Sequence, residues 1–254
     1  MSDIEDVKRE VAIGNRLLTE LGIAVGVCAS LGHVSMRLPS DPGKFAVKGR
    51  GYRIDALAHM RPEDMVICDL DGNWLDGPPG SLQCSEVKIH SCIYSSRPDV
   101  HSVAHAHPDY TVLVTVLGKA IVPLAQEGIA VVAEELPVYP HTKVVQSDEE
   151  GREVARLLGA GHSLLMLGHG AVTTGRSVEA SVMALAQLEH QARLNYLALC
   201  AAGRDHRRIP DDLVQEVLRG NPMPPHLKAR SDQVGGRAGG GVWAYFSAGA
   251  AAGM

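Results

Sequence analysis

Apolar and polar residues recur along the chain with two periods, which predicts a mixture of helices and strands. Residues 4–21 carry apolar side chains at helical spacing, and Gly22 after them is a stop signal. Ser85 follows a proline- and glycine-rich turn and predicts the N-cap of a helix that ends near residue 96. The other predicted elements are strands at 31–38, 45–47, 121–125, 129–132 and 136–139, a hairpin within 61–76, strands within 100–107 and 163–170, and helices within 109–117, 147–158 and 177–202.

The alternation of elements continues to about residue 205 without an internal repeat or a linker. We therefore expect residues 1–205 to form one α/β domain. Residues 206–254 differ. Residues 206–241 carry several prolines and the sequence GGRAGGG, which predicts a loop or partial disorder, and an aromatic group, VWAYF, follows. An aromatic cluster after a glycine linker predicts docking, either on the same subunit or on a neighbouring one.

Composition narrows the class of protein without indicating a function. The 254 residues suffice for a sizeable core, with 45% apolar and 21% charged residues. A net charge of −5 without a basic run predicts no binding to nucleic acid or to anionic membranes. The charged N-terminus is not a secretory signal, and no apolar stretch reaches the ~18 residues of a membrane span. Five scattered cysteines without a CxxC pair complete the prediction of a reduced, cytoplasmic protein.

Two histidines one residue apart, His105 and His107, interrupt an apolar strand pattern. Residues two apart on a strand point the same way and lie ~6.6–7 Å apart, so their imidazole nitrogens can converge on one ion at ~2.0–2.1 Å. Taken alone, such a pair is more often packed in a core or placed on a surface. A metal site needs a third ligand. His169 is the natural candidate, because it follows the end of a buried strand, where sites form in α/β sheets.

Glu86 opens a predicted helix, where the helix dipole stabilises a carboxylate. It can be an ordinary first-turn glutamate, a base or a metal-facing carboxylate, and the residue alone does not decide between these. His169 can likewise be a simple turn residue. Three histidines beside glycine or proline breaks are nevertheless hard to explain by packing alone. Together they predict a metal site on His105, His107 and His169.

The stretches SEVKIHSCIYSSRPDVHSVAHAHPDY (85–110) and LLMLGHGAVTTGRSVEASVMALAQLE (164–189) resemble the class II aldolase/adducin family. They contain, in the family's order, a helix-opening glutamate, an RPDV turn, an HxHP strand, an HG strand end and a GxS helix start. The similarity extends over roughly residues 5–203. The resemblance implies an α/β fold, a three-layer α/β/α sandwich around a mainly antiparallel sheet. It also implies homotetramers with active sites at the subunit interfaces.

For the site, the resemblance implies one divalent metal ion per subunit on the three histidines, with Zn2+ or Mn2+ ahead of Fe2+ or Co2+. Glu86 is then an acid/base or an additional ligand. The family's sugar-phosphate enzymes hold phosphate with a GN turn, an SG loop and an SS pair. This chain instead has Gly32-His33, VKGRG at residues 47–51, and Gln83-Cys84-Ser85. Imidazole and cations thus replace small hydroxyl and amide donors, which disfavours a phosphorylated sugar.

The sequence GHVSMRLP resembles the decarboxylase-like branch of the family, which acts on hydroxylated aromatic or pyridine dicarboxylates. It implies a metal-dependent lyase that decarboxylates a small hydroxyaromatic or related aromatic carboxylate, with the metal stabilising a carbanion or enolate. An aldolase or retro-aldolase acting on an unphosphorylated hydroxy-carbonyl compound is the alternative. A non-catalytic, adducin-like interaction protein is a third hypothesis, which the retained histidines and glutamate disfavour.

Individual residues around the metal ligands are candidates for catalysis and substrate binding. Glu86 and His33 are the predicted catalytic residues, because both can carry a proton. Arg37, Lys48 or Arg50 can hold a second carboxylate, and Lys48 is the weaker candidate beside Arg50. Each candidate also has an ordinary structural explanation as a turn, strand or solvated residue. The predicted substrate contacts are Arg37, Arg50, Ser35, Ser85 and Tyr245.

Overall fold

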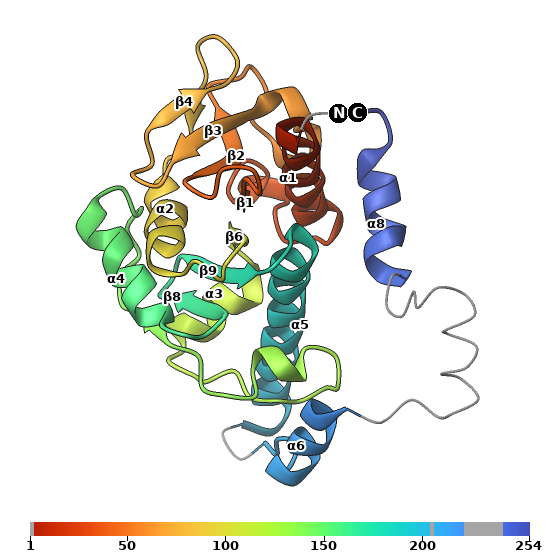
Figure 1. Cartoon of the computed structure of the whole chain (residues 1–254). Coiled ribbons are helices and arrows are strands. Elements are labelled where there is room, and N and C mark those ends of the chain that lie inside the picture. Colours follow the sequence, from red (N-terminus) through yellow and green to blue (C-terminus); the bar gives the residue numbers. More distant parts are fainter. Residues whose placement is uncertain (1–2, 204–205, 221–240) are drawn as a thin grey trace.

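A mainly antiparallel sheet forms the centre of the computed structural model, which describes residues 3–203, 206–220 and 241–254 (Figure 1). The strand order is β4-β3-β2-β1-β6-β9-β8-β7, and β5 pairs with β2. Among the described strand pairs, β7 and β8 run parallel and the others antiparallel. The strands are β1 (His33–Arg37), β2 (Lys44–Arg50), β3 (Met65–Asp69), β4 (Trp74–Asp76), β5 (Leu82–Gln83), β6 (Ser102–Ala106), β7 (Val138–Tyr139), β8 (Ser163–Met166) and β9 (Gly170–Gly175).

Helices cover both faces of this sheet (Figure 1). The α-helices of the described residues are α1 (Asp3–Glu20), α2 (Val87–Ser96), α3 (Asp109–Val116), α4 (Asp148–Leu158), α5 (Val178–Ala202), α6 (Asp211–Arg219) and α8 (Gly241–Ala251), and short 3-10 helices lie at Gly26–Cys28, Leu57–His59, Pro62–Asp64 and Ile129–Val131. One core lies between the sheet and α1, α3 and α5. A second core lies between the sheet and α2 and α4. The predicted three-layer α/β/α sandwich is therefore confirmed.

Alternation along the central strands decides which side chains face α2. Ala104 of β6 belongs to the core under α1 and α5, whereas Val103 belongs to the core under α2 and α4. Because side chains alternate along a strand, His105 shares the face of Val103. β1 pairs with β6 so that His33 lies directly opposite His105. Cross-strand neighbours on one face are close enough to interact, so the register brings these two imidazoles together.

Several helices begin where their sequence signals predict. Ser147 and Glu150 form the predicted capping box at α4, and the Ser177 hydroxyl accepts a hydrogen bond from a backbone amide at the start of α5. The prediction for Ser85 is wrong, because Glu86 occupies the N-cap position of α2. The Glu86 side chain makes no capping bond there, since its carboxylate points toward histidines instead.

Two predicted strands are also wrong. Residues 121–125 form no strand, and the segment at 129–131 is a 3-10 helix. Buried side chains on α5 take the place of a sheet neighbour, because Asn195 and Gln191 accept hydrogen bonds from backbone amides of this segment. Conversely, β9 lies between β6 and β8 although the sequence did not predict it. Its glycine, alanine and threonine residues give a weak hydrophobic pattern.

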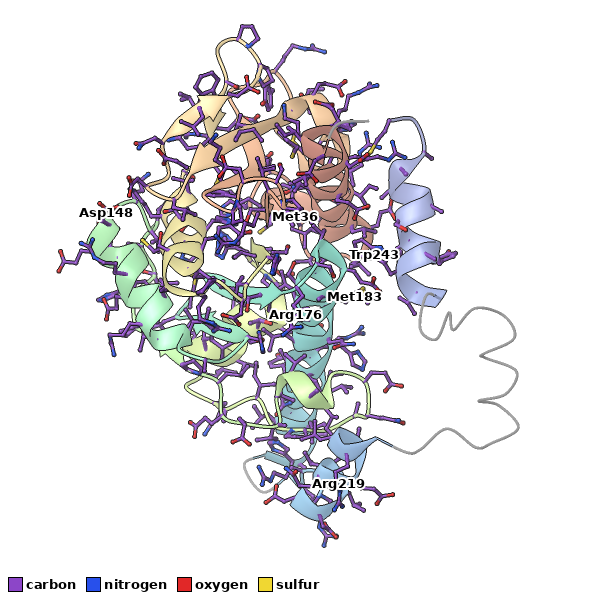
Figure 2. All side chains as sticks on the ribbon, viewed as in Figure 1. Met36, Asp148, Arg176, Met183, Arg219 and Trp243 are labelled. Carbon is purple, nitrogen blue, oxygen red and sulfur yellow. The ribbon has the colours of Figure 1, made fainter. Side chains whose placement is uncertain are left out.

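The C-terminal aromatic residues lie on α8, which packs beside α1 (Figure 1). Trp243 (labelled in Figure 2) and Phe246 pack against the core, and Arg16 of α1 donates to the carbonyl oxygen of Ala250. Tyr245 on the same helix is 74% exposed. Helix α6 forms within residues 206–241, for which the sequence predicted a loop. Residues 221–240, which include GGRAGGG except its last glycine, lie outside the described residues. No helix among the described residues combines the length and apolarity needed to cross a membrane.

Candidate metal centre

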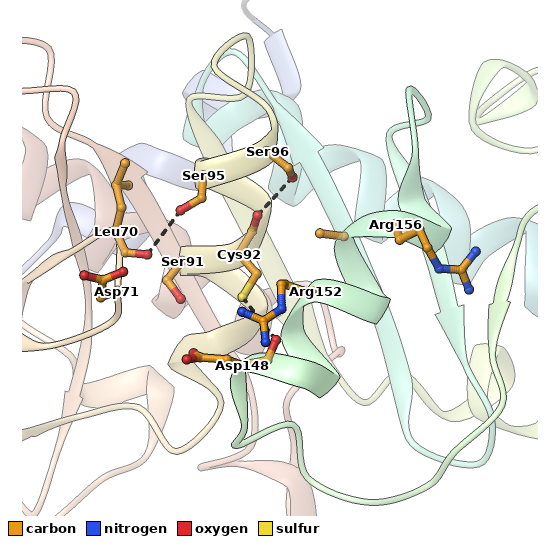
Figure 3. A pocket seen from close by; sticks show the side chains of 10 residues that line it. Leu70, Asp71, Ser91, Cys92, Ser95, Ser96, Asp148, Arg152 and Arg156 are labelled. Carbon is orange, nitrogen blue, oxygen red and sulfur yellow. Dashed lines mark hydrogen bonds between the residues drawn. The ribbon is translucent and has the colours of Figure 1, made fainter.

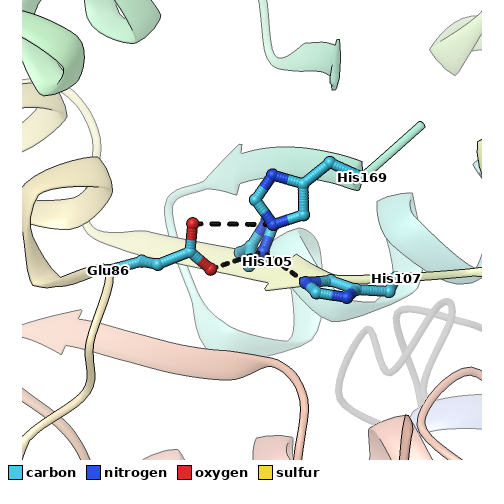
Figure 4. A group of neighbouring side chains, drawn as sticks. All are labelled: Glu86, His105, His107 and His169. Atoms are coloured by element: carbon cyan, nitrogen blue, oxygen red, sulfur yellow. Dashed lines mark hydrogen bonds and ion pairs between the residues drawn. The ribbon is translucent and has the colours of Figure 1, made fainter. Parts of the chain in front are cut away.

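Four predicted site residues meet at one end of the central sheet (Figure 4). His105 lies on β6, His107 directly after this strand, and His169 in the turn between β8 and β9. Glu86 immediately precedes α2. Gly170 allows the two histidine-bearing segments to approach, because a Cβ at this position would lie 2.2 Å from a backbone oxygen of β6.

The donor atoms of these four residues converge on one point. The Nε2 atoms of His105 and His107 are 3.1 Å apart. The two carboxylate oxygens of Glu86 lie 3.2 Å from Nε2 of His105 and 3.5 Å from Nε2 of His169. One donor atom from each residue lies within 4.8 Å of the others. Two nitrogens that bind one tetrahedral ion at ~2.0–2.1 Å are roughly 3.3 Å apart, so the observed spacing fits a single ion.

The surrounding hydrogen bonds leave lone pairs at the centre of the cluster. Nδ1 of His105 lies 3.0 Å from the carbonyl oxygen of Ala171, which can only accept, so the neutral ring carries its proton on Nδ1. Nε2 of His105 then presents a lone pair to His107 and to the Glu86 carboxylate. Buried acceptors that face one another are costly unless a cation lies between them. The four residues therefore form a possible metal site.

The ionisation states at this cluster are those of metal ligands. Burial alone would raise the pKa of Glu86, but interactions with the imidazoles of His105, His169 and His33 outweigh burial and hold that pKa well below its usual range. Burial, reinforced by His105 and His169, lowers the pKa of His107 to about 3. Ionised carboxylates and neutral imidazoles are the forms that bind metal ions, so neither group must lose a proton at neutral pH.

A cavity of about 190 Å3 beside the cluster contains part of the predicted substrate site. Its lining includes His33, Ser85 and Arg50, which the sequence predicted. Nε2 of His33 lies 3.7 Å from a Glu86 carboxylate oxygen, and burial lowers the pKa of His33 to about 4. A cavity of about 150 Å3 is known to hold benzene, so one substituted ring fits this volume.

Lys48 also lines this cavity, and it is more deeply buried than the sequence suggested. Lys48 is only 4% exposed, whereas Arg50 is exposed and donates to the backbone carbonyl of Gln83. Within the described residues, the Lys48 ammonium makes no hydrogen bond or ion pair. Burial accordingly lowers the pKa of Lys48. The signal was present in the VKGRG stretch, but the sequence could not show which of its cations is buried.

Three predicted substrate contacts lie away from this cavity. Arg37 as a substrate contact stays a prediction that its environment disfavours, because its guanidinium is buried and four of its five N–H groups donate to backbone carbonyls. The Ser35 hydroxyl lies in the core between His90 and Tyr94. Tyr245 is on α8, outside α1, and does not reach the cluster of its own subunit (Figure 1).

A larger cavity, of about 520 Å3, lies on the outer side of α2 and α4 (Figure 3). Serines and Cys92 from α2 and two arginines from α4 line it, but none of the four cluster residues does. Cavity size alone therefore does not identify the site. The convergent donors, which can act on a ligand, distinguish the smaller cavity.

Comparisons with known proteins bear on this cluster and on the fold. A profile described as the class II aldolase and adducin N-terminal domain matches residues 9–196. A 3,4-dihydroxyphthalate decarboxylase of Arthrobacter keyseri is 29% identical over 83% of this chain and 85% of its own length. The enzyme with the same description from Terrabacter sp. (strain DBF63) is 30% identical over 79% and 84%. An aldolase II superfamily structure from Pseudomonas syringae has a TM-score of 0.76 at 20% identity, covering 92% of each chain, which shows the fold.

Replacing any of the three histidines is expected to remove the metal ion. His105→Ala, His107→Ala and His169→Ala should each reduce bound divalent metal from about one ion per chain to a small fraction, measured by elemental analysis after dialysis. Metal addition should raise the melting temperature of the parent protein but not of these variants, because a ligand stabilises only a fold that binds it. His141→Ala, at an exposed position outside the cavity, is the control. Full metal retention in all three variants would contradict the assignment.

Removal of the Arg37 side chain is expected to destabilise the fold without changing metal content. Arg37→Met leaves several backbone carbonyls unpaired, so the free energy of unfolding should fall by about 2–3 kcal/mol in urea titrations. Arg53→Met, at an exposed arginine, should change stability by less than about 0.5 kcal/mol. A stable Arg37→Met protein with impaired ligand binding would restore the predicted substrate role.

Proposed function

Because this chain belongs to the class II aldolase and adducin family, we propose that it is a divalent-metal-dependent carbon–carbon lyase that decarboxylates a hydroxyaromatic carboxylate. One observation carries the proposal: three imidazole nitrogens and an ionised carboxylate converge beside a cavity that contains a buried, unpaired ammonium group. Relatives described as 3,4-dihydroxyphthalate decarboxylases support this chemistry. Zn2+ and Mn2+ are the preferred ions for a centre of three histidines, with Fe2+ or Co2+ as alternatives.

The buried ammonium of Lys48 supports a substrate with a second carboxylate. A buried charge without a partner is costly, and a bound carboxylate would remove this cost. Arg50 lies at the exposed side of the same cavity and adds a second positive charge. Asp55 also lines this cavity, but its carboxylate accepts from two backbone amides and forms no ion pair with either cation among the described residues. A neutral sugar would therefore leave both cations without a paired anion. The cavity is therefore suited to a dianionic aromatic acid that carries one carboxylate near the metal centre and another near Lys48.

Proton transfer during decarboxylation is assigned to Glu86. A bound divalent cation would supply a Lewis acid that favours ionisation of the substrate hydroxyl and orients the adjacent carboxylate. Glu86 takes the proton of that hydroxyl, which leaves a phenolate. The phenolate electron pair moves into the ring, and the ring carbon that bears the carboxylate takes the proton from Glu86. The carbon–carbon bond then breaks, CO2 leaves, and the product phenolate takes a proton from solvent.

Two alternatives to the decarboxylase are an aldolase with the same metal centre and a non-catalytic protein. An aldolase or retro-aldolase acting on an unphosphorylated hydroxy-carbonyl compound needs a similar anion-stabilising centre, so the product must separate it from a decarboxylase. An adducin-like interaction protein does not require four convergent donor groups, and their presence counts against that hypothesis.

A second copy of this chain is proposed to cover the mouth of the cavity. Leu31 and Val144 line the cavity and are exposed, and nearby in the sequence Val27 is 97% exposed. Exposed apolar side chains around a site are typical of surfaces that bind another protein. This arrangement supports a subunit interface beside the active site, and a homotetramer is the assembly that membership of the family suggests.

The reaction is tested by following CO2 directly. Purified protein loaded with one defined metal is incubated with ortho-hydroxy aromatic carboxylates, vicinal aromatic dicarboxylates and, separately, hydroxy-ketones. We expect CO2 and a decarboxylated phenol in equal amounts from an aromatic acid. Glu86→Gln should keep the metal on its three histidines and lower kcat by about 10²–10⁴-fold. Cleavage of a hydroxy-ketone without CO2 would establish the aldolase instead, and no turnover of either panel would remove the enzyme proposal.

Substrate charge is tested at Lys48. For a dicarboxylate, Lys48→Met should lower kcat/KM by about 30-fold or more, because the second carboxylate loses its buried partner. For the same compound without that carboxylate, the change should stay within about threefold. Lys44→Met, on the same strand but paired with Asp41 away from the cavity, is the matched control. Equal losses on both substrates would show that Lys48 does not bind the second carboxylate.

A further inference from the structure

A hydrogen-bonded chain of buried side chains runs from the cavity into the core under α2. Nδ1 of His33 lies 2.6 Å from Nε2 of His90. Nδ1 of His90 lies 2.6 Å from the Ser35 hydroxyl, which lies 2.7 Å from the Tyr94 hydroxyl. These four residues are buried. The proton transfers described above use none of the last three.

The hydrogen-bonded row of side chains is not a second metal site. Cys84 lies close enough to His33 and His90 to complete a set of three donors. However, the two imidazole nitrogens are 2.6 Å apart, much closer than the roughly 3.3 Å of two ligands on one tetrahedral ion. Burial also raises the pKa of the Cys84 thiol, which keeps it protonated. A proton, and not a metal ion, therefore lies between His33 and His90.

Each neutral member of the chain donates one proton and accepts another, so the chain can point in only two directions. In the inward direction, His33 donates from Nδ1 to His90, and the last donor, Tyr94, reaches the His101 carbonyl at 3.4 Å. In the outward direction, Tyr94 donates to Ser35, Ser35 donates to His90, and His90 donates from Nε2 to His33. The proton of His33 is then on Nε2, the ring nitrogen beside Glu86, and both residues line the cavity.

Electrostatics favours the outward direction. Nε2 of His33 lies 3.7 Å from a carboxylate oxygen of Glu86. In the inward direction a bare nitrogen lone pair would face this ionised carboxylate, whereas in the outward direction an N–H group faces it. Burial lowers the pKa of His90 well below its usual range, so His90 is uncharged and has a single ring proton to give.

We propose that His90, supported by Ser35 and Tyr94, is a positioning residue that holds His33 as its Nε2–H tautomer, with that N–H directed into the cavity. This inference rests on the proposed function only where it concerns catalysis. There, the oriented Nε2–H of His33 would donate to an anionic oxygen of the substrate. A donor that is already oriented stabilises developing negative charge without reorganisation. In the outward direction the hydrogen-bonded chain begins at the buried hydroxyl of Tyr94, so it fixes an orientation and does not conduct protons to solvent.

The tautomer is measured first, without any substrate. ¹⁵N NMR of Zn2+-loaded, histidine-labelled protein, with the His33 signals identified by their loss in His33→Gln, should show a protonated Nε2 and an unprotonated Nδ1 in His33. In Ser35→Ala and His90→Phe, we expect His33 to become a mixture of both tautomers. A His33 ring protonated on Nδ1 in the parent protein would overturn the proposal, whatever reaction the protein catalyses.

Kinetics then separates positioning from a purely structural role. With a substrate that is turned over, Ser35→Ala and Tyr94→Phe should lower kcat about 10–100-fold, with metal content unchanged and KM changed less than kcat. Tyr139→Phe is the matched control, because Tyr139 is an equally buried tyrosine of the same core whose hydroxyl has no hydrogen-bond partner among the described residues. Equal effects at the two tyrosines, or losses that follow only the melting temperature, would reduce the chain to core packing.

Discussion

Mutual repulsion among buried acceptors is the constraint on which this site depends. Glu86, His105, His107 and His169 direct oxygen and nitrogen lone pairs at one small volume, and a carbonyl oxygen fixes the His105 proton on the outer side of its ring. Such a group is stable only with positive charge at its centre. Metal binding at this proposed site would therefore be linked to folding, because a cation would offset the cost of burying these groups.

The antiparallel register of the sheet fixes the positions of the site residues relative to one another. β6 lies between β1 and β9, so a residue at its end has His33 on one side and the start of β9 on the other. The turn before β9 carries His169, and the turn before α2 carries Glu86. Because strands and helix termini hold these groups, the donors keep their geometry before any ligand arrives, which is the condition for effective catalysis.

Chemical specificity resides in side chains around the shared centre. The fold is common to sugar-phosphate aldolases and to other proteins of the family, so the fold alone does not select a reaction. Two features of this site bear on the substrate: a buried lysine without a hydrogen-bond or ion-pair partner among the described residues, and the imidazole of His33 beside the cavity. Both support the proposed anionic substrate. His33 would in addition need a defined tautomer, which the buried residues behind it can supply.

The amino-acid sequence by itself determined the long helices and the four residues of the possible metal site. It also indicated the three-layer sandwich, through the resemblance to a known family. These follow from local signals, such as the capping box at Ser147, or from short motifs with characteristic spacing. Only the tertiary structure decided which cations face the cavity. Arg37 and Lys48 are both cations, one in a predicted strand and one directly after a predicted strand, but the Arg37 guanidinium donates to four backbone carbonyls, whereas the Lys48 ammonium has no hydrogen-bond partner among the described residues. The same holds for His90 and Ser35, whose role depends on hydrogen-bond partners distant in the sequence, and no local pattern encodes such partners.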